Sequence, residues 1–301
     1  MPVLLRETLE FLEPERGGLF VDCTLGLGGH AEALLAASPM LRLIGIDRDP
    51  AAHERARRRL AAFEERVTYL EGDFGDIEEL LERAGVDRVA GVLADLGVSS
   101  MQLDTPERGF SFRFDGPLDM RMGRSGPTAG DIVNRYGEAE LVKIFSEYGE
   151  ERQARRVARA IVAARQDAPI ETTSELKSVI HRAKHQYGRR RIDPATQVFQ
   201  ALRIEVNREL EDLKHLMAKV AELLDRDGRL VVISYQSLED RIVKNTLRDL
   251  ARGEIDEVTG RPHAETRLLE VLTRKPVRPD EAEVALNPRA RSARLRAARR
   301  I

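Results

Sequence analysis

Over the first hundred residues, the pattern of hydrophobic and polar positions switches repeatedly between one typical of strands and one typical of helices. Short apolar runs that end in turn residues predict strands, and the amphipathic stretches between them predict helices. The expected strands cover residues 19–22, 41–47, 67–70 and 89–93, and the expected helices cover residues 30–37, 50–63 and 77–84. Strands that alternate with helices in this way predict βαβ units and a parallel sheet.

This alternation stops after the fourth expected strand. A segment rich in glycine, proline, aspartate and arginine follows from Ser99 to about Gly126, and only helical patterns appear from about Thr128 to Leu224. The expected helices there cover 150–165, 173–185 and 194–224. Strand patterns then return at 228–234, 268–273 and 282–286, with a helix at 238–250 between the first two. We therefore expect an α/β fold whose doubly wound sheet is built from residues 1–103 and 209–301, with an inserted all-helical domain at 104–208.

Composition narrows the class of protein. The chain has 301 residues, of which 42% are hydrophobic and 33% charged, as in a globular protein with a sizeable core. No apolar run approaches the roughly 20 residues that span a bilayer, and the first residues do not resemble an export leader. Cys23 is the only cysteine, which excludes an intrachain disulfide. We expect a cytoplasmic protein without a membrane partner.

The formal net charge of −2 conceals an uneven distribution. Residues 1–103 carry 11 basic and 19 acidic side chains (net −8), whereas 104–209 and 210–301 each carry 19 and 16 (net +3). Two basic regions on a nearly neutral chain indicate either a polyanionic partner or solvated helix faces. The arginines that could contact phosphates are Arg152, Arg155, Arg156, Arg159, Arg189, Arg190, Arg191, Arg289, Arg291, Arg294 and Arg296.

A glycine-rich turn follows the first expected strand. Residues 26–31 match G-x-G-x-x-G/A between a strand and a helix, and such glycines let the backbone approach a ligand at the helix N-terminus. Asp47 ends the second expected strand about 20 residues later, where a carboxylate can accept hydrogen bonds from ribose hydroxyls. The combination predicts a nucleotide-type ligand, and the alternative is a merely tight turn.

Acidic residues at the strand ends indicate which nucleotide is bound. Asp22, Asp47, Asp73 and Asp95 follow the four expected strands, and Phe74 could pack beside an adenine. Carboxylates repel a pyrophosphate but attract the ammonium and sulfonium groups of S-adenosylmethionine. The arrangement resembles the class I (Rossmann-like) methyltransferase fold more than a dehydrogenase, so a nicotinamide-dependent oxidoreductase is the weaker alternative.

Several ordered segments carry a closer resemblance. They are residues 26–30 (GLGGH), 46–50 (IDRDP), 95–100 (DLGVSS), 102–104 (QLD), 108–112 (RGFSF), 116–122 (GPLDMRM), 148–152 (YGEER), 237–244 (SLEDRIVK) and 287–292 (NPRARS). Together they resemble the bacterial ribosomal RNA small subunit methyltransferase H family across essentially the whole chain. The resemblance implies S-adenosylmethionine-dependent methylation of the N4 amine of one cytosine in the decoding region of 16S rRNA, within the small ribosomal subunit. It also implies these cofactor contacts: Gly28, Gly29, His30, Asp47, Phe74, Asp95 and Gln102.

The expected chemistry places specific demands on the site. Methyl transfer to an exocyclic amine needs the two reacting atoms in line, and an acceptor on the amine N–H would share the developing positive charge. Asp95 is the candidate acceptor, although Asp95-Leu96-Gly97-Val98 lacks the Pro-Pro-aromatic segment common in amino-methyltransferases of nucleic acids, so Asp95 could instead bind only the cofactor. The candidates for stacking on the target base are Phe110, Phe112, Phe114 and Tyr235.

Substrate contacts are expected outside the glycine turn. Charged residues in loops near a site are functional candidates, and we assign substrate binding to Arg108, Asp119, Arg121, Arg289 and Arg291, with structural ion pairs as the alternative. His181 and His185 have helical i, i+4 spacing, but without a third ligand we expect no metal. Other function classes left open are an amino-methyltransferase of DNA or another RNA and a non-catalytic ribosome-assembly factor. A homodimer is also left open.

Overall fold

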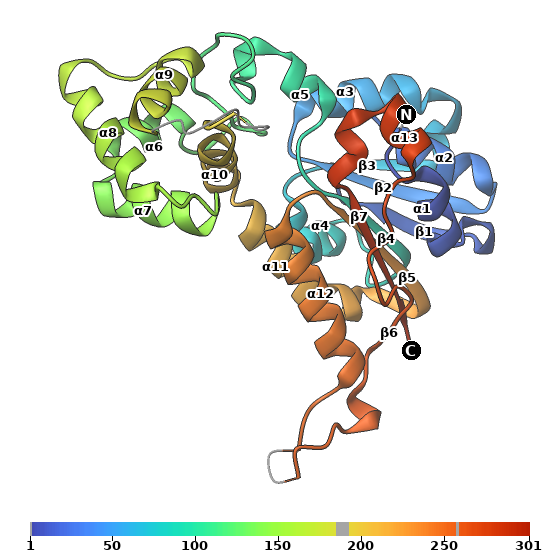
Figure 1. The fold of residues 1–301 in the computed structure, drawn as a ribbon. Helices are drawn as coiled ribbons and strands as arrows, with labels where there is room; N and C mark the ends of the chain where they lie inside the picture. Colours follow the sequence, from blue (N-terminus) through green and yellow to red (C-terminus); the bar gives the residue numbers. More distant parts are fainter. Residues whose placement is uncertain (1, 185–192, 257–258) are drawn as a thin grey trace. The chain divides into compact units, whose positions relative to one another are not determined.

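The computed structural model describes residues 2–184, 193–256 and 259–301, and it separates into two compact units. The first unit comprises Met1–Gly97 and Leu210–Ile301, and the second comprises Val98–Glu209. Figure 1 shows the elements of both units along the chain.

A seven-stranded sheet forms the centre of the first unit, in the order β3-β2-β1-β4-β5-β7-β6. The strands are β1 (Gly18–Asp22), β2 (Leu41–Asp47), β3 (Val67–Glu71), β4 (Val89–Asp95), β5 (Leu224–Ser234), β6 (Leu269–Val271) and β7 (Arg294–Arg300). Strands β1 to β5 pair in parallel, whereas β7 runs antiparallel to both β5 and β6. The order 3-2-1-4-5 is that of a doubly wound sheet, so the expected α/β fold is confirmed.

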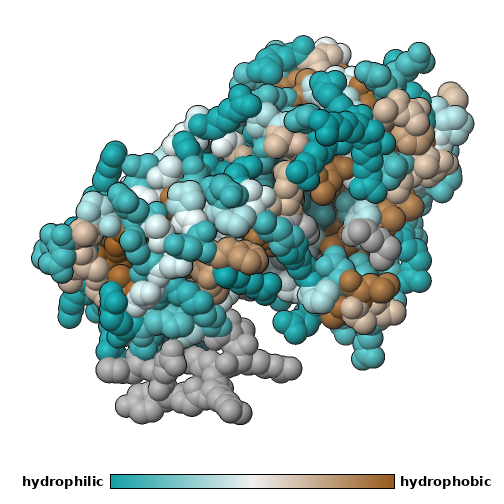
Figure 2. Space-filling view, turned by 90° about the horizontal axis from the view of Figure 1, so that it is seen from above, coloured by the Kyte–Doolittle hydropathy of each residue, from teal (hydrophilic) through white to brown (hydrophobic). Residues whose placement is uncertain are grey.

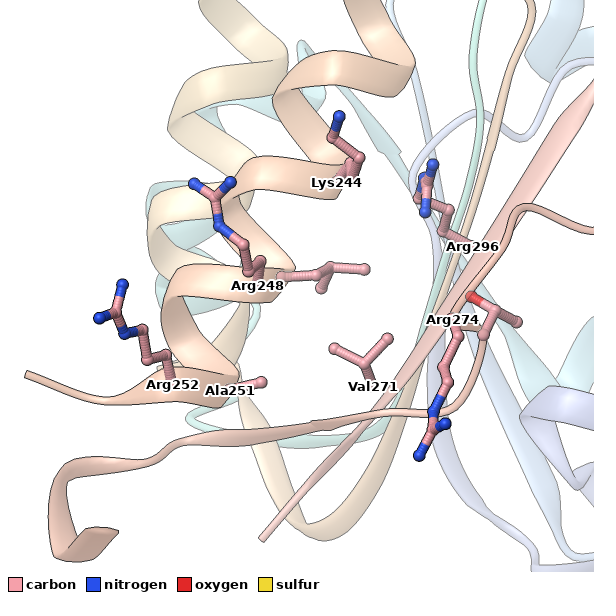
Figure 3. Close-up of a pocket in the computed structure, with 9 residues that line it drawn as sticks. Lys244, Arg248, Ala251, Arg252, Val271, Arg274 and Arg296 are labelled. Atoms are coloured by element: carbon pink, nitrogen blue, oxygen red, sulfur yellow. The ribbon is translucent and has the colours of Figure 1, made fainter. Parts of the chain in front are cut away.

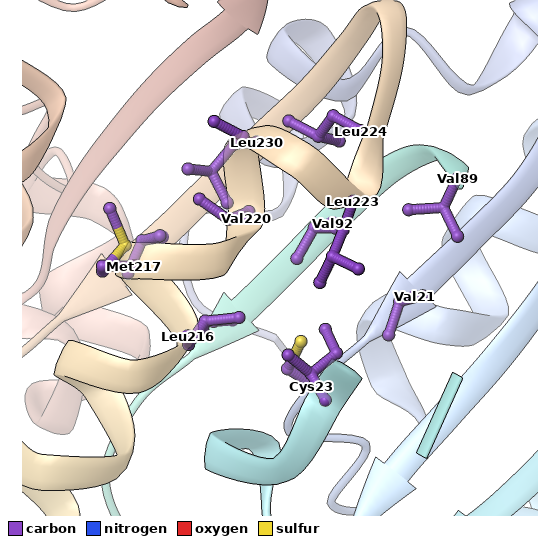
Figure 4. Packing of buried hydrophobic residues seen from close by; sticks show 14 of the residues in the cluster. Val21, Cys23, Val89, Val92, Leu216, Met217, Val220, Leu223, Leu224 and Leu230 are labelled. Carbon is purple, nitrogen blue, oxygen red and sulfur yellow. The ribbon is translucent and has the colours of Figure 1, made fainter. Parts of the chain in front are cut away.

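Helices cover both faces of this sheet. They are α1 (Leu5–Leu12), α2 (Gly29–Ala37), α3 (Pro50–Arg59), α4 (Ile77–Arg83), α11 (Glu209–Leu223) and α12 (Ser237–Arg252). The short helix α13 (Glu281–Leu286) has no buried residue. Successive strand residues alternate between the two faces: Val21 packs in the cluster with α4, α11 and α12, and Phe20 packs in the cluster with α1, α2 and α3. Figure 4 shows Leu216, Met217 and Val220 of α11 in the first of these clusters.

The second unit consists of helices around its own core. They are α5 (Ser100–Asp104), α6 (Ala129–Arg135), α7 (Glu138–Glu147), α8 (Ala154–Asp167), α9 (Thr173–Ala183) and α10 (Thr196–Asn207). Its buried cluster includes Phe145, Val157 and Leu202 from three different helices. The unit therefore buries an apolar core of its own.

Four sequence expectations differ from the structure. The strand expected at 282–286 is wrong: this segment is helix α13, which Asp280 caps by accepting a hydrogen bond from the Glu283 N–H. Strand β7 was not predicted, because its arginines obscured the buried Leu295, Ala297 and Ala298.

The two other differences concern helix boundaries. The helix expected at 150–165 begins only at Ala154, because Glu150 has a left-handed φ of 49°. Arg152, which the expected helix included, therefore lies outside α8. The helix expected at 194–224 is two helices, because Arg208 has a φ of 50° and breaks the pattern between α10 and α11.

Polar side chains cover most of the face shown in Figure 2. In the described part of the chain, no helix has both the length and the apolar character needed to cross a bilayer.

Candidate active site

The glycine turn joins β1 to α2 in a conformation that favours glycine. Gly26 and Gly28 have φ values of 51° and 73°, in the left-handed region where a Cβ is strained. The Gly28 N–H donates to the Leu25 carbonyl at 2.8 Å, and the Leu25 N–H donates to the Ile46 carbonyl at 2.9 Å. A Cβ on Gly29 would lie 2.7 Å from Cγ of Pro2. The first two positions thus shape the turn, and the third allows close packing of the N-terminal segment.

Asp47, at the end of β2, holds the turn in place. Its Oδ2 accepts a hydrogen bond from the Gly26 N–H at 2.8 Å, and its Oδ1 accepts one from the Asp49 N–H at 2.8 Å. Burial raises the pKa of Asp47, although these two backbone hydrogen bonds oppose the shift. Each carboxylate oxygen retains a second lone pair for a ligand donor.

Asp22 ends β1, His30 lies in the first turn of α2, and Asp95 ends β4. Asp22 and His30 are buried, whereas the Asp95 side chain is 24% exposed. Burial raises the pKa of Asp22 to about 6, with the carboxylates of Asp95 and Asp47 adding to the shift and His30 opposing it. His30 Nε2 lies 3.5 Å from Asp95 Oδ2, but neither ring nitrogen makes a hydrogen bond with the described residues. A buried ring without a hydrogen-bond partner beside two carboxylates is typical of a ligand site rather than of a stabilised core.

Tyr235, directly after β5, contacts the same group. Its hydroxyl donates to Asp95 Oδ1 at 2.8 Å. Burial and the neighbouring Asp95 raise the pKa of Tyr235, so the phenol remains a donor. The Asp95 N–H in turn donates to Thr24 Oγ1 at 2.7 Å. Tyr235 was expected only as a stacking candidate, and its link to Asp95 could not be inferred because β5 is about 140 residues from β4.

Phe74 and Asp73 follow β3 and lie beside an arginine that the sequence did not single out. Arg48 pairs with Asp73 and also with Asp212, at 2.9 Å. Its guanidinium lies 6.0 Å from the centre of the Phe74 ring, which is half-buried. Of the four expected strand-end acids, Asp73 is thus the one paired with a cation at short range.

The second unit contains Gln102, which was expected to contact the cofactor. Gln102 is buried and forms a capping box at the start of α5: its Oε1 accepts from the Ser99 N–H, and its own N–H donates to Ser99 Oγ. The side chain thus fixes the first turn of this short helix.

Three of the expected substrate residues lie in the loop between α5 and α6. Arg121 forms a two-pronged pair with Asp119, at 2.9 Å from Nε to Oδ1 and 2.7 Å from Nη2 to Oδ2. Arg108 Nη2 donates to the carbonyls of Arg121 and Met122, both at 2.9 Å. These charges therefore also organise the loop that carries them.

The phenylalanines of this loop differ in exposure. Phe110 is buried, Phe112 packs edge-on against Phe199 with ring centres 4.9 Å apart, and Phe114 is 53% exposed. Phe114 is the one that presents a ring to solvent.

The expected basic residues fall into different environments. Arg155, Arg156 and Arg159 are exposed on α8, and Arg289 and Arg291 are exposed in the 3₁₀ turn Pro288–Ser292. Arg296, in contrast, is buried in β7, where its Nε donates to Asp240 Oδ1 at 2.6 Å. Arg189, Arg190 and Arg191 lie outside the described residues.

Only one histidine of the expected i, i+4 pair is among the described residues. His181 Nε2 lies 2.8 Å from Asp193 Oδ1, and His185 is outside the described residues. Among the residues that are described, no group of three histidine, cysteine, aspartate or glutamate side chains is placed to hold a metal ion.

Comparison with known proteins gives the family. The model of the MraW methylase family matches residues 1–301. The chain belongs to the MraW methylase family. It is 51% identical over 310 residues to a Geobacter sulfurreducens protein named "Ribosomal RNA small subunit methyltransferase H", covering 100% of this chain and 98% of that one. A Thermobifida fusca protein of the same name is 49% identical over 306 residues, covering 100% and 93%.

Solved structures resemble this member of the MraW methylase family more distantly. A putative methyltransferase from Streptococcus mutans in complex with SAH has a TM-score of 0.46 and 10% identity, covering 100% of this chain and 99% of that one.

Proposed function

We propose that this member of the MraW methylase family is an S-adenosylmethionine-dependent rRNA methyltransferase. Its target, as the sequence resemblance implies, is the N4 amine of one cytosine in the decoding region of 16S rRNA. The names of the relatives that align over the full chain support 16S rRNA as the substrate class. We also propose a cytoplasmic location, because the substrate is a small ribosomal subunit.

The observation that carries this proposal is the set of carboxylates around the glycine turn. Asp22, Asp47 and Asp95 lie at the carboxyl ends of β1, β2 and β4, where the strand order reverses and α/β sheets bind ligands. Three carboxylates suit a ligand that carries ammonium and sulfonium charges and disfavour a pyrophosphate. This fit supports S-adenosylmethionine over a nicotinamide dinucleotide.

We assign each expected cofactor-binding residue a contact with S-adenosylmethionine. Asp47 would accept from the ribose hydroxyls with its remaining lone pairs, and Phe74 would pack against the adenine. Gly28 and Gly29 let the ligand approach the backbone, and His30 and Asp22 lie beside the charged end. Gln102 stays a proposed cofactor contact because the family resemblance implies it. When bound, S-adenosylmethionine supplies a methyl group activated by positive sulfur.

Asp95 is the proposed acceptor for the target amine. Tyr235 donates to its Oδ1, and its Oδ2 lies 3.5 Å from His30 Nε2, so the carboxylate is held between two neighbours. Accepting from the amine N–H would stabilise the positive charge that develops on nitrogen during transfer. Burial raises the pKa of Cys23 far above its usual value, which supports direct transfer without a covalent cysteine intermediate.

We propose that the inserted region, 104–208, recognises the RNA. Arg155, Arg156 and Arg159 are exposed cations on one helix and suit phosphate contacts. The residues proposed for substrate binding remain Arg108, Asp119, Arg121, Arg289 and Arg291.

The test uses methyl-labelled S-adenosylmethionine with small ribosomal subunits that lack the modification, and with naked 16S rRNA and DNA in parallel. Products are digested to nucleosides and resolved by mass. Label in N4-methylcytidine from subunits or rRNA is the expected result, and Asp95→Ala should abolish it. Label in DNA, or in another nucleoside, contradicts the proposed target. The mass of the active protein in solution tests the homodimer.

A further inference from the structure

A groove with a cationic rim lies on the first unit, away from the glycine turn. Its volume is about 510 Å³, within the range of about 300–1,000 Å³ that is typical of ligand sites. Lys244, Arg248 and Arg252 come from α12 on one side, and Val271 and Arg274 come from β6 and the segment after it on the other (Figure 3). We call this site the α12 groove.

The α12 groove is distinct from the cofactor crevice within the same unit. Strand β6 is the outermost strand of the sheet, and β7 and β5 separate it from β4, where Asp95 ends the strand. A ligand in the α12 groove therefore does not contact the carboxylates at the ends of β1, β2 and β4.

Its rim carries several positive charges and no acidic side chain. Lys244, Arg248 and Arg252 are exposed and spaced four residues apart, so they share one face of α12. Like charges at this spacing destabilise a helix. These three side chains therefore do not stabilise α12 through their charges.

Some rim cations have partners and others do not. Arg296 is held by Asp240, and Arg248 Nη2 lies 3.0 Å from Asp249 Oδ1. In contrast, Lys244, Arg252 and Arg274 have no ion pair with any residue that the structure describes. Three exposed cations are thus free to neutralise an external anion.

The floor of the groove is apolar. Leu247, Ala251 and Val271 line the groove together with the charged residues, and Leu247 is 2% exposed. A free phosphate ion has no apolar surface that could contact this floor. A nucleic-acid strand, in contrast, presents sugar and base surfaces next to its phosphates.

We propose that the α12 groove binds the phosphodiester backbone of the substrate rRNA, with Lys244, Arg252 and Arg274 contacting phosphates and the apolar floor contacting a ribose or base. This inference rests on the proposed function, since it takes rRNA as the substrate. It adds an RNA-docking site on the sheet-containing unit to the one proposed for the helical insertion.

The test compares two triple variants with the same change in charge. Lys244→Gln, Arg252→Gln and Arg274→Gln together alter the groove. The control combines Arg42→Gln, Arg55→Gln and Arg88→Gln, which are exposed cations of the same unit without a described ion pair. Arg42 lies near the start of β2 and Arg88 precedes β4, so both are at the opposite end of the strands from the cofactor crevice.

Binding to a decoding-region fragment of 16S rRNA is measured by fluorescence anisotropy over a series of KCl concentrations. We expect the groove variant to bind about tenfold or more weakly at low salt and to lose about 2 from the slope of log K against log salt, as for three phosphate contacts on single strands. The control variant should keep the slope of the unaltered protein. Affinity for S-adenosylmethionine should be unchanged in both.

Equal affinities and slopes for the groove and control variants overturn the inference. So does a groove variant that binds the RNA fragment normally but binds intact small subunits weakly, because the partner would then be a ribosomal protein. These outcomes are separate from failure of the proposed function, which appears as absence of N4-methylcytidine with the unaltered protein. The binding measurement needs no methyl transfer.

Discussion

Aspartates in the two units of this protein occupy opposite electrostatic environments. Burial raises the pKa of Asp22 and of Asp47 at the sheet ends of the first unit. In the second unit, burial alone would raise the pKa of Asp119, but hydrogen bonds from Arg121 lower it below its usual value. Hydrogen bonds from the Thr128 N–H and hydroxyl likewise lower the pKa of Asp131.

The direction of the pKa shift distinguishes carboxylates that are paired within the fold from carboxylates that are available to bind a ligand. Asp119 has its donor two residues away in the same loop, and Asp131 has its donors in Thr128, the N-cap of α6, so ionisation of both favours the folded state. Asp22 is buried near two further carboxylates, so its ionisation opposes folding until a cation arrives. A lowered pKa thus marks carboxylates that already have donors in the second unit, and a raised pKa marks the carboxylates of the proposed ligand site in the first.

Among the changes that sharpen this comparison, replacing Asp47 is expected to have the largest effect, and the effect is on the affinity for S-adenosylmethionine. Asp47→Ala removes the proposed ribose acceptor and the hydrogen bond that holds Gly26, so we expect S-adenosylmethionine to bind about 100-fold more weakly, corresponding to about 2.7 kcal/mol. Isothermal titration calorimetry measures the change. Asp119→Ala is the control and should leave the affinity within about twofold. Unchanged affinity in Asp47→Ala would contradict the role assigned to the end of β2.

Stability should respond in opposite directions in the two units. Asp22 has a pKa of about 6 when folded against a usual value of 3.8, so its ionisation at pH 7 opposes folding by about 3 kcal/mol at most. Asp22→Asn keeps an acceptor for the Thr24 N–H and should stabilise the cofactor-free protein by about 1–3 kcal/mol. Asp119→Asn should destabilise it by about 1–2 kcal/mol, because the Arg121 pair is lost. Urea unfolding at pH 7 measures both.

The pH dependence gives the sign of each contribution. Because the folded pKa of Asp22 is raised, the unaltered protein should lose stability relative to Asp22→Asn as the pH rises from about 4 to about 6. Because the folded pKa of Asp119 is lowered, its contribution should be present above about pH 4 and lost as the pH falls below that value. An Asp22→Asn protein that is less stable at every pH would show that the carboxylate stabilises the cofactor-free fold.

The sequence predicted the parts of this comparison that depend on local pattern. The alternation of strands and helices placed Asp22, Asp47 and Asp95 at strand ends, and parallel strands bring such ends to one edge of a sheet. The glycine turn could be predicted for the same reason, since the positive φ values of Gly26 and Gly28 require this residue type locally.

The parts that were missed depend on pairing between distant residues. Strand β7 carries four arginines, and the sequence alone does not show that Asp240, 56 residues earlier, neutralises the buried Arg296. The pairing of Arg48 with Asp212 could not be predicted either, because Asp212 lies 164 residues later in the chain. Of the residues that line the α12 groove, Arg296 was among the arginines expected to contact phosphates. Lys244, Arg248, Arg252 and Arg274 were missed, because α12 and the segment after β6 converge only in the folded chain.

The smallest effect is expected for Tyr235, a positioning residue that acts through Asp95. Tyr235→Phe removes one hydrogen bond to Asp95 Oδ1 and keeps the ring, so kcat for rRNA methylation should fall about fivefold, corresponding to about 1 kcal/mol. The KM for rRNA and the affinity for S-adenosylmethionine should change less than twofold. This distinguishes a positioning role from a purely structural role, since a structural defect would weaken binding as well. Tyr69→Phe is the matched control, since the Tyr69 hydroxyl has no hydrogen bond within the described part of the chain. Equal kcat values for the two variants would show that Asp95 needs no support from Tyr235, leaving His30 and the Thr24 contact to hold the acceptor.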